Sequence, residues 1–197
     1  MALLPLALTA LRALLAPVLV LLSLYFPNGT AMGVCMVLAF VSDILDGIIA
    51  RRLNIATPTL RRLDSAADSV FYTAAAFAVW HLYPAEIRNN LWPLLVLVTL
   101  EIGRYVFDFA KFRREASYHM WSSKLWGIGL FGALFALLAM GQGGWPVALA
   151  VYWGIVTDVE GLAISITLHE WKSDVPSLVH ALRIRALDGY NPGTSLQ

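Results

Sequence analysis

The sequence predicts an all-α integral membrane protein with six transmembrane helices. Of its 197 residues, 59% are hydrophobic and 14% are charged, and the apolar residues form long stretches. Soluble domains contain about 25% charged residues, so a soluble fold of this length would have too little polar surface to cover itself. The formal net charge of +1 gives no sign of a polybasic nucleic-acid-binding protein. The single cysteine, Cys35, excludes a disulfide within the chain.

Six stretches reach the roughly 20 mostly apolar residues that a membrane-spanning helix needs. They cover about 4–26, 31–50, 65–83, 91–110, 122–141 and 146–168. The first lacks a basic region before its apolar run and is interrupted by Arg12, which argues against a signal peptide. Turn-forming residues separate the stretches, for example Pro27-Asn28-Gly29 and the glycine-rich segment 141–144. We expect residues 1–170 to form one six-helix membrane domain and residues 171–197 to form a polar cytoplasmic tail.

The basic residues predict the orientation of these helices, because positively charged loops remain on the cytoplasmic side. Two loops and the tail contain most of them: Arg51, Arg52, Arg61, Arg62, Lys111, Arg113, Arg114, Lys172, Arg183 and Arg185. The loops on the opposite side contain only Arg88. We therefore expect both termini to be cytoplasmic, in a bacterial inner membrane or an equivalent membrane.

Two pairs of aspartates lie at the cytoplasmic ends of the second and third predicted spans. Charges within apolar helices are costly and usually functional. Asp43 and Asp46 share one helical face with the small residues Gly47 and Ala50, which leaves space in front of the acids. The second pair, Asp64 and Asp68, is spaced one helical turn apart.

Four carboxylates cannot all stay ionised in a low-dielectric site without cations. Oxygen ligands of this kind suit Mg²⁺ or Mn²⁺, and enzymes use such ions mainly on substrates with phosphates. The alternative is that the aspartates pair with neighbouring arginines at the membrane surface. Surface pairing would not require small residues beside the acids.

These residues strongly resemble the signature of the CDP-alcohol phosphotransferase family, D-x2-D-G-x2-A-R-x8-G-x3-D-x3-D. Seven of its eight fixed positions are present, namely Asp43, Asp46, Gly47, Ala50, Arg51, Asp64 and Asp68. The segment Leu8-Thr9-x-x-Arg12-x4-Pro17 is also similar to the first-helix pattern of that family. The resemblance covers the membrane domain, and the six predicted spans fit it.

The resemblance implies transfer of a phosphatidyl or related phospho-alcohol group from a CDP-linked donor to an alcohol, with release of CMP. It implies two divalent ions, Mg²⁺ or Mn²⁺. By position, Asp43 resembles the acid that bridges both ions, Asp46 a ligand of the first, and Asp64 a ligand of both. Asp68 resembles the ligand of the second ion that also acts as general base. The positions that match contacts to the CDP-linked donor are Thr9, Gly47, Arg51 and Thr57. Relatives in the family suggest a homodimer.

Two local features bear on the CDP part of the donor. Thr57-Pro58 predicts the N-cap and first residue of the third long helix, and a helix N-terminus favours anions. The second glycine of the family signature is replaced by Leu60. If the helix begins at Pro58, Leu60 lies one turn before Asp64 on the same face. Its side chain would then occupy space that the family leaves for the nucleotide.

Basic residues on the cytoplasmic side suggest that the acceptor alcohol carries a phosphate, such as inositol phosphate or glycerol phosphate. The candidates are Lys111, Arg113, Arg114 and Lys124. Positive-inside bias explains them without a ligand, and serine or another uncharged-headgroup alcohol is the alternative acceptor. Glu101, Arg104, Asp108 and Lys111 also fit a structural ladder of ion pairs one turn apart. Asp158 and Glu160 either line a cavity or bond neighbouring helices.

Two other functions also use acids in a membrane protein. An intramembrane prenyltransferase depends on paired acidic motifs and divalent ions, but such enzymes resemble longer chains with more spans. An ion or proton carrier would need acids along a transmembrane track, whereas here they gather at one end. Only the preferred function requires a CDP-linked lipid donor.

Overall fold

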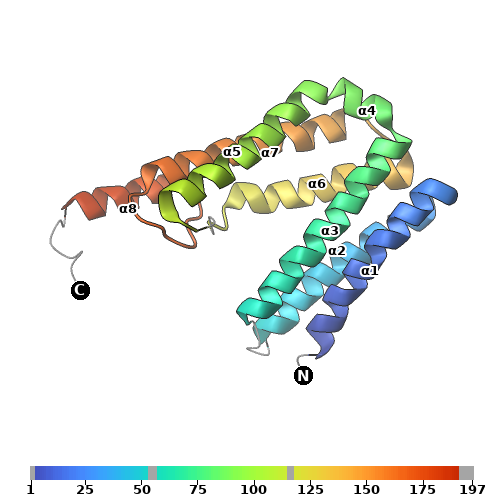
Figure 1. Ribbon diagram of the computed structural model, residues 1–197, viewed down its shortest axis with the longest axis horizontal. Coiled ribbons are helices and arrows are strands. Elements are labelled where there is room, and N and C mark those ends of the chain that lie inside the picture. The colour runs from blue at the N-terminus through green and yellow to red at the C-terminus, as the bar shows by residue number, and fades with distance from the viewer. Residues whose placement is uncertain (1–2, 53–56, 115–117, 191–197) are drawn as a thin grey trace. The chain divides into compact units, whose positions relative to one another are not determined.

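The sequence forms long helices wherever apolar residues run without interruption, and proline or glycine separates them. The computed structural model describes residues 3–52, 57–114 and 118–190, and every regular element within these ranges is an α helix (Figure 1). The helices are α1 Leu3–Tyr25, α2 Gly29–Arg52, α3 Pro58–Leu82, α4 Pro84–Asn89, α5 Leu91–Phe112, α6 Trp121–Met140, α7 Trp145–Thr167 and α8 Leu178–Tyr190. The predicted all-α class is therefore confirmed for the described residues.

Four of the described helices are long and apolar enough to cross a membrane. These segments are Leu4–Tyr25, Gly29–Ile49, Trp121–Met140 and Trp145–Thr167. They correspond to the first, second, fifth and sixth predicted spans. The helices α3 and α5 occupy the positions of the other two but contain more polar and charged residues. The structure thus supports a membrane protein with four apolar helices of spanning length.

The chain divides into two compact units. The first contains Met1–Asn89 and Phe131–Val147, and the second contains Asn90–Leu130 and Ala148–Gln197. The helices α6 and α7 therefore contribute residues to both units.

In the first unit, α1 packs against both α2 and α3. The buried core is rich in alanine and leucine, and the small alanine side chains let helices approach closely. Gly29 of α2 shows how close the packing is, because a Cβ atom there would lie 2.5 Å from the carbonyl oxygen of Ala139 in α6. This packing places α1 where a side chain can reach residues of both α2 and α3.

In the second unit, part of the segment that we expected to be a polar tail is helical and packed. Val175 and Ala181 are 1% and 0% exposed, and they join a buried cluster with Tyr118, Ile164 and Leu168. The first turn of α8 is capped from α7, since Leu178 N donates to Glu160 Oε1 at 3.2 Å. The sequence did not predict α8, because its cap and its apolar partners come from distant residues.

Candidate active site

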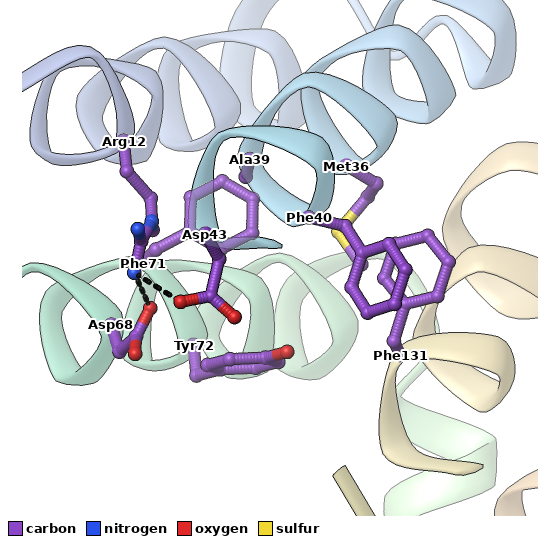
Figure 2. A pocket seen from close by; sticks show the side chains of 9 residues that line it. All are labelled: Arg12, Met36, Ala39, Phe40, Asp43, Asp68, Phe71, Tyr72 and Phe131. Carbon is purple, nitrogen blue, oxygen red and sulfur yellow. Dashed lines mark hydrogen bonds and ion pairs between the residues drawn. The ribbon is translucent and has the colours of Figure 1, made fainter. Parts of the chain in front are cut away.

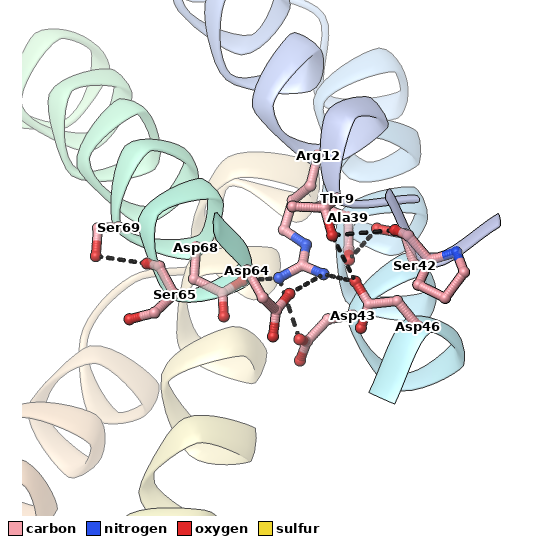
Figure 3. Close-up of polar contacts among 11 residues, drawn as sticks. Thr9, Arg12, Ala39, Ser42, Asp43, Asp46, Asp64, Ser65, Asp68 and Ser69 are labelled. Carbon is pink, nitrogen blue, oxygen red and sulfur yellow. Dashed lines mark hydrogen bonds and ion pairs between the residues drawn. The ribbon is translucent and has the colours of Figure 1, made fainter. Parts of the chain in front are cut away.

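The four aspartates come from the last turns of α2 and the first turns of α3. The start of α3 is fixed as the sequence predicts. Thr57 is the N-cap residue, Pro58 is the first helical residue, and Thr57 Oγ1 accepts a hydrogen bond from Leu60 N at 3.2 Å. One turn later, α3 presents Asp64 and then Asp68 toward α2 (Figure 3). The two acid pairs that are about 20 residues apart in sequence therefore lie together.

Arg12 of α1 lies at the centre of this group (Figure 3). Its Nη1 atom is 3.1 Å from Asp43 Oδ1 and also forms an ion pair with Asp68 Oδ1. Its Nη2 atom is 2.5 Å from Asp46 Oδ2 and 3.1 Å from Asp64 Oδ1. Each terminal nitrogen therefore contacts one aspartate of α2 and one aspartate of α3. We call these four aspartates the aspartate cluster.

The aspartate cluster has the donor set that a hard divalent cation requires. Asp43, Asp64 and Asp68 each offer one carboxylate oxygen, and these oxygens lie within 4.8 Å of one another. Asp64 Oδ1 is buried and accepts no hydrogen bond in the described structure, although Arg12 Nη2 is nearby. Four carboxylates against one guanidinium also leave an excess of negative charge. The residues present therefore fit the divalent ions that the sequence predicts.

A small pocket lies directly beside Arg12 and has one charged and one apolar end (Figure 2). Asp43 and Asp68 line it together with Arg12 and Tyr72. At the other end the rings of Phe40 and Phe131 stack with their centroids 4.1 Å apart. The charged end of the pocket is thus part of the aspartate cluster, and its other end is aromatic.

The residues expected to bind the CDP-linked donor lie on three elements of the first unit. Thr9 is buried one turn before Arg12, and its hydroxyl donates to Pro5 O at 3.0 Å and to Asp46 Oδ2 at 3.4 Å. Gly47 follows Asp46 on α2 and is half-buried, and Thr57 caps α3. The side chain of Arg51 lies outside the described part of the structure. Leu60 is half-buried in the first turn of α3.

The candidate acceptor-binding residues belong to the second unit. Lys111 Nζ donates to three carbonyl oxygens at the end of α7, those of Ser165 at 2.8 Å, Ile166 at 3.2 Å and Leu168 at 2.7 Å. It therefore caps α7. The side chains of the other three candidates cap no helix in the contacts described. Arg113 is exposed, in the left-handed position that ends α5. The Arg114 guanidinium carbon lies 5.4 Å from the centre of the Trp171 ring, and Lys124 Nζ lies 4.6 Å from the centre of the Trp121 ring.

A second polar pocket, of about 270 Å³, lies within the second unit. Arg104 Nη2 is 3.3 Å from Glu101 Oε1 on the same helix, and Arg104 Nε is 3.3 Å from Asp158 Oδ1 on α7. Asp158 therefore has both roles that the sequence left open: it lines this pocket, and its ion pair with Arg104 joins α7 to α5. Tyr118 at the pocket edge hydrogen-bonds Ser165 Oγ at 2.9 Å, and burial raises the pKa of its phenol.

The residue that the sequence analysis did not assign to the site is Arg12. In the sequence, Arg12 interrupts an apolar run and forms part of the first-helix pattern. A signal was present in the sequence, because Arg12 is the sole charged residue of α1 and so must find its partners on other helices. Which helices supply them depends on tertiary packing.

The apolar helices and the four clustered carboxylates together define a class of protein: a membrane protein with a group of acids that could hold a divalent cation. A model of the family described as CDP-alcohol phosphatidyltransferase matches residues 2–159, and the chain belongs to this family. The resemblance seen in the aspartate motif is thereby confirmed. The description of the family names a phosphatidyltransferase.

A curated relative gives more detail. A CDP-diacylglycerol–glycerol-3-phosphate 3-phosphatidyltransferase from Pseudomonas fluorescens is 36% identical over 104 residues, which make up 50% of this chain and 50% of that protein. The chain thus spans about half the length of the curated relative that it matches. No solved structure matches the chain.

Proposed function

We propose that this chain transfers the phosphatidyl group of CDP-diacylglycerol to an alcohol phosphate, such as glycerol phosphate or inositol phosphate, and releases CMP. The observation that carries the proposal is the convergence of Asp43, Asp46, Asp64 and Asp68 in a chain of this family. The printed name of the Pseudomonas relative, which specifies CDP-diacylglycerol and glycerol 3-phosphate, supports this choice of substrates.

The aspartate cluster would hold two divalent ions, Mg²⁺ or Mn²⁺. Asp43, Asp64 and Asp68 supply the converging oxygens, and Asp46 supplies the fourth carboxylate. When bound, such ions neutralise the donor pyrophosphate and make its lipid-side phosphorus more electrophilic. Gly47 and Arg51 on α2, Thr57 before α3 and Thr9 on α1 bind the CDP part of the donor.

Asp68 acts as the general base. Its carboxylate takes the proton from the acceptor hydroxyl as the alkoxide oxygen forms a bond to the lipid-side phosphorus. The bond between that phosphorus and the bridging oxygen breaks, and CMP leaves with the bonding electrons. The side chain of Asp68 is 34% exposed, so an acceptor hydroxyl can reach it. Of the four basic residues considered for the acceptor phosphate, Arg113, Arg114 and Lys124 are the candidates, because Lys111 Nζ already donates to three carbonyl oxygens at the end of α7.

The proposal includes a particular membrane arrangement. The helices α3 and α5 would join the four apolar helices to give six spans, with residues 1–170 as one membrane domain and 171–197 as a cytoplasmic tail. Both termini would be cytoplasmic, in a bacterial inner membrane or its equivalent, and the chain would act as a homodimer. The basic residues near Arg51, Arg113 and Arg183 support this orientation.

The first prediction tests the reaction itself. Purified protein in detergent micelles is supplied with Mg²⁺, CDP-diacylglycerol and glycerol 3-phosphate, and CMP release is measured. We expect release to require all three components, and the product to be a phosphatidyl ester of the acceptor. Activity with a prenyl diphosphate in place of the CDP-linked lipid, or no CMP with any alcohol or alcohol phosphate, would contradict the proposal.

A further inference from the structure

Arg12 is a buried cation on a helix that is otherwise uncharged. It is 1% exposed, and its partners found in the described structure are all aspartates of α2 and α3. A buried guanidinium needs such partners, since removing it from water costs several kcal/mol. Because α1 packs against both α2 and α3, Arg12 links the two acid pairs from the helix between them.

The contacts of Arg12 are divided in a regular way. Nη1 contacts Asp43 and Asp68, while Nη2 contacts Asp46 and Asp64. Each nitrogen thus contacts one acid of α2 and one of α3, and the planar guanidinium places its single delocalised positive charge between the two pairs. The Arg12 side chain therefore occupies the position beside the carboxylates that bound cations would take, but it supplies only one positive charge.

The same carboxylates cannot serve a guanidinium and divalent ions equally well. Arg12 contacts Oδ1 of Asp43, Asp64 and Asp68, the three residues whose carboxylate oxygens lie close enough together that they could hold a cation. A bound positive charge in contact with carboxylates lowers the affinity of a second cation for them. Arg12 Nε has no hydrogen-bond partner in the described structure, so its position is held by the ion pairs.

We propose that Arg12 is a positioning residue of the active site: it is the resident counter-ion of the aspartate cluster and competes with divalent ions for its carboxylates. The inference rests on the proposed function in one respect, the assignment of these aspartates as metal ligands. In the absence of metal, Arg12 keeps α1, α2 and α3 together. As metal binds, its guanidinium gives up contacts to Asp43, Asp64 and Asp68.

The test is a measurement of Mg²⁺ affinity that does not use activity. Isothermal titration of purified protein in detergent, without substrate, gives the Kd for Mg²⁺ of the wild type and of Arg12→Met. Loss of the competing charge is expected to lower this Kd about tenfold or more. In EDTA, Arg12→Met is expected to have a lower melting temperature than the wild type. Saturating Mg²⁺ should narrow this difference between the two proteins. A merely structural role would lower the melting temperature without tightening Mg²⁺ binding.

Arg104→Met is the matched control, since it removes a cation that is also paired with two acids but lies in the second unit. Its Mg²⁺ affinity should equal that of the wild type. If Arg12→Met does not fold, Arg12→Lys is measured in its place. One ammonium cannot contact both acid pairs as the planar guanidinium does, so we expect the Kd for Mg²⁺ of Arg12→Lys to be about threefold lower than that of the wild type.

An unchanged or raised Kd in whichever Arg12 variant folds would overturn the inference. If the wild type still releases CMP in a Mg²⁺-dependent way, the proposed function survives that result. If the wild-type protein binds no Mg²⁺, the inference that Arg12 competes with divalent ions is overturned as well. If the wild type also releases no CMP, the proposed function fails too.

Discussion

The four aspartates differ in how far they are exposed, and this difference suits different tasks. The side chain of Asp46 is 5% exposed, whereas those of Asp43, Asp64 and Asp68 are between 33% and 44% exposed. A buried carboxylate must be paired, and Asp46 has both Arg12 and Thr9 beside it. The other three are open to ions and to substrate. Asp68 also lines the small pocket beside Arg12.

Replacing Asp68 with asparagine tests its role as general base. The amide has nearly the same shape but cannot take a proton, so turnover should fall by roughly 10²–10⁴-fold, while the donor still binds. CMP release gives turnover, and titration with a CDP-linked lipid gives donor affinity. Asp174→Asn, at an exposed aspartate of the second unit, is the matched control and should keep wild-type activity. Undiminished turnover in Asp68→Asn would show that another group accepts the proton.

Among the elements, the end of α7 depends on a single side chain from α5. The last carbonyl groups of a helix have no partners within the helix, and Lys111 supplies a charged donor to three carbonyls at or just beyond this end. The same contact ties α5 to α7 within the second unit. An ammonium bonded in this way is poorly placed to bind an acceptor phosphate as well.

Lys111→Ala should therefore reduce stability and leave acceptor binding largely unchanged. Hydrogen bonds to a charged group contribute about 1.5–3 kcal/mol, so we expect a lower melting temperature in detergent and an acceptor KM within about twofold of wild type. Lys124→Ala is the comparison, because the Lys124 ammonium lies over an aromatic ring and donates to no carbonyl in the side-chain contacts described. Wild-type stability together with a strongly raised acceptor KM in Lys111→Ala would assign Lys111 to the acceptor instead.

The sequence predicted elements well where the signal is local. The N-cap at Thr57 and the first helical residue Pro58 depend on neighbouring residues, and both are confirmed. The short helix α4 and the helix α8 were not predicted. The cap of α8 comes from Glu160, and among the side chains of α8 that the structure describes, Ala181 is buried and Leu178 and Ile184 are partly buried. Such elements form because of tertiary contacts, which hydrophobic periodicity does not contain.

For the site, motif spacing predicted that Asp43, Asp46, Asp64 and Asp68 lie together, because consecutive helices with acids at the same end must bring them close. It did not predict that Arg12 lies among them. An arginine in an apolar helix needs acidic partners, but one-dimensional sequence offers several acids and no means to choose between them. The choice follows from α1 packing against both α2 and α3.

At the scale of the whole molecule, the proposed arrangement with six membrane-spanning helices has an alternative in which four helices span. The two possibilities differ at α3 and α5. If α3 spans, the segment after it, near Asn89, lies on the side of the membrane opposite to the N-terminus. If only α1, α2, α6 and α7 span, Asn89 lies on the same side as the N-terminus. The segment around Gln142, between α6 and α7, lies opposite the N-terminus in both cases.

Single cysteines labelled with a membrane-impermeant maleimide distinguish these arrangements. Cys35 is buried and is replaced by alanine first, so that Asn89→Cys, Gln142→Cys and Ser173→Cys each provide one exposed thiol. With six spans and cytoplasmic termini, Asn89→Cys and Gln142→Cys are labelled in intact cells, and Ser173→Cys is labelled only after permeabilisation. Labelling of Asn89→Cys only after permeabilisation, with Gln142→Cys still accessible, would mean four spans. The aspartates at the start of α3 would then lie on a helix that rests at the membrane surface, because polar residues exclude it from the bilayer core.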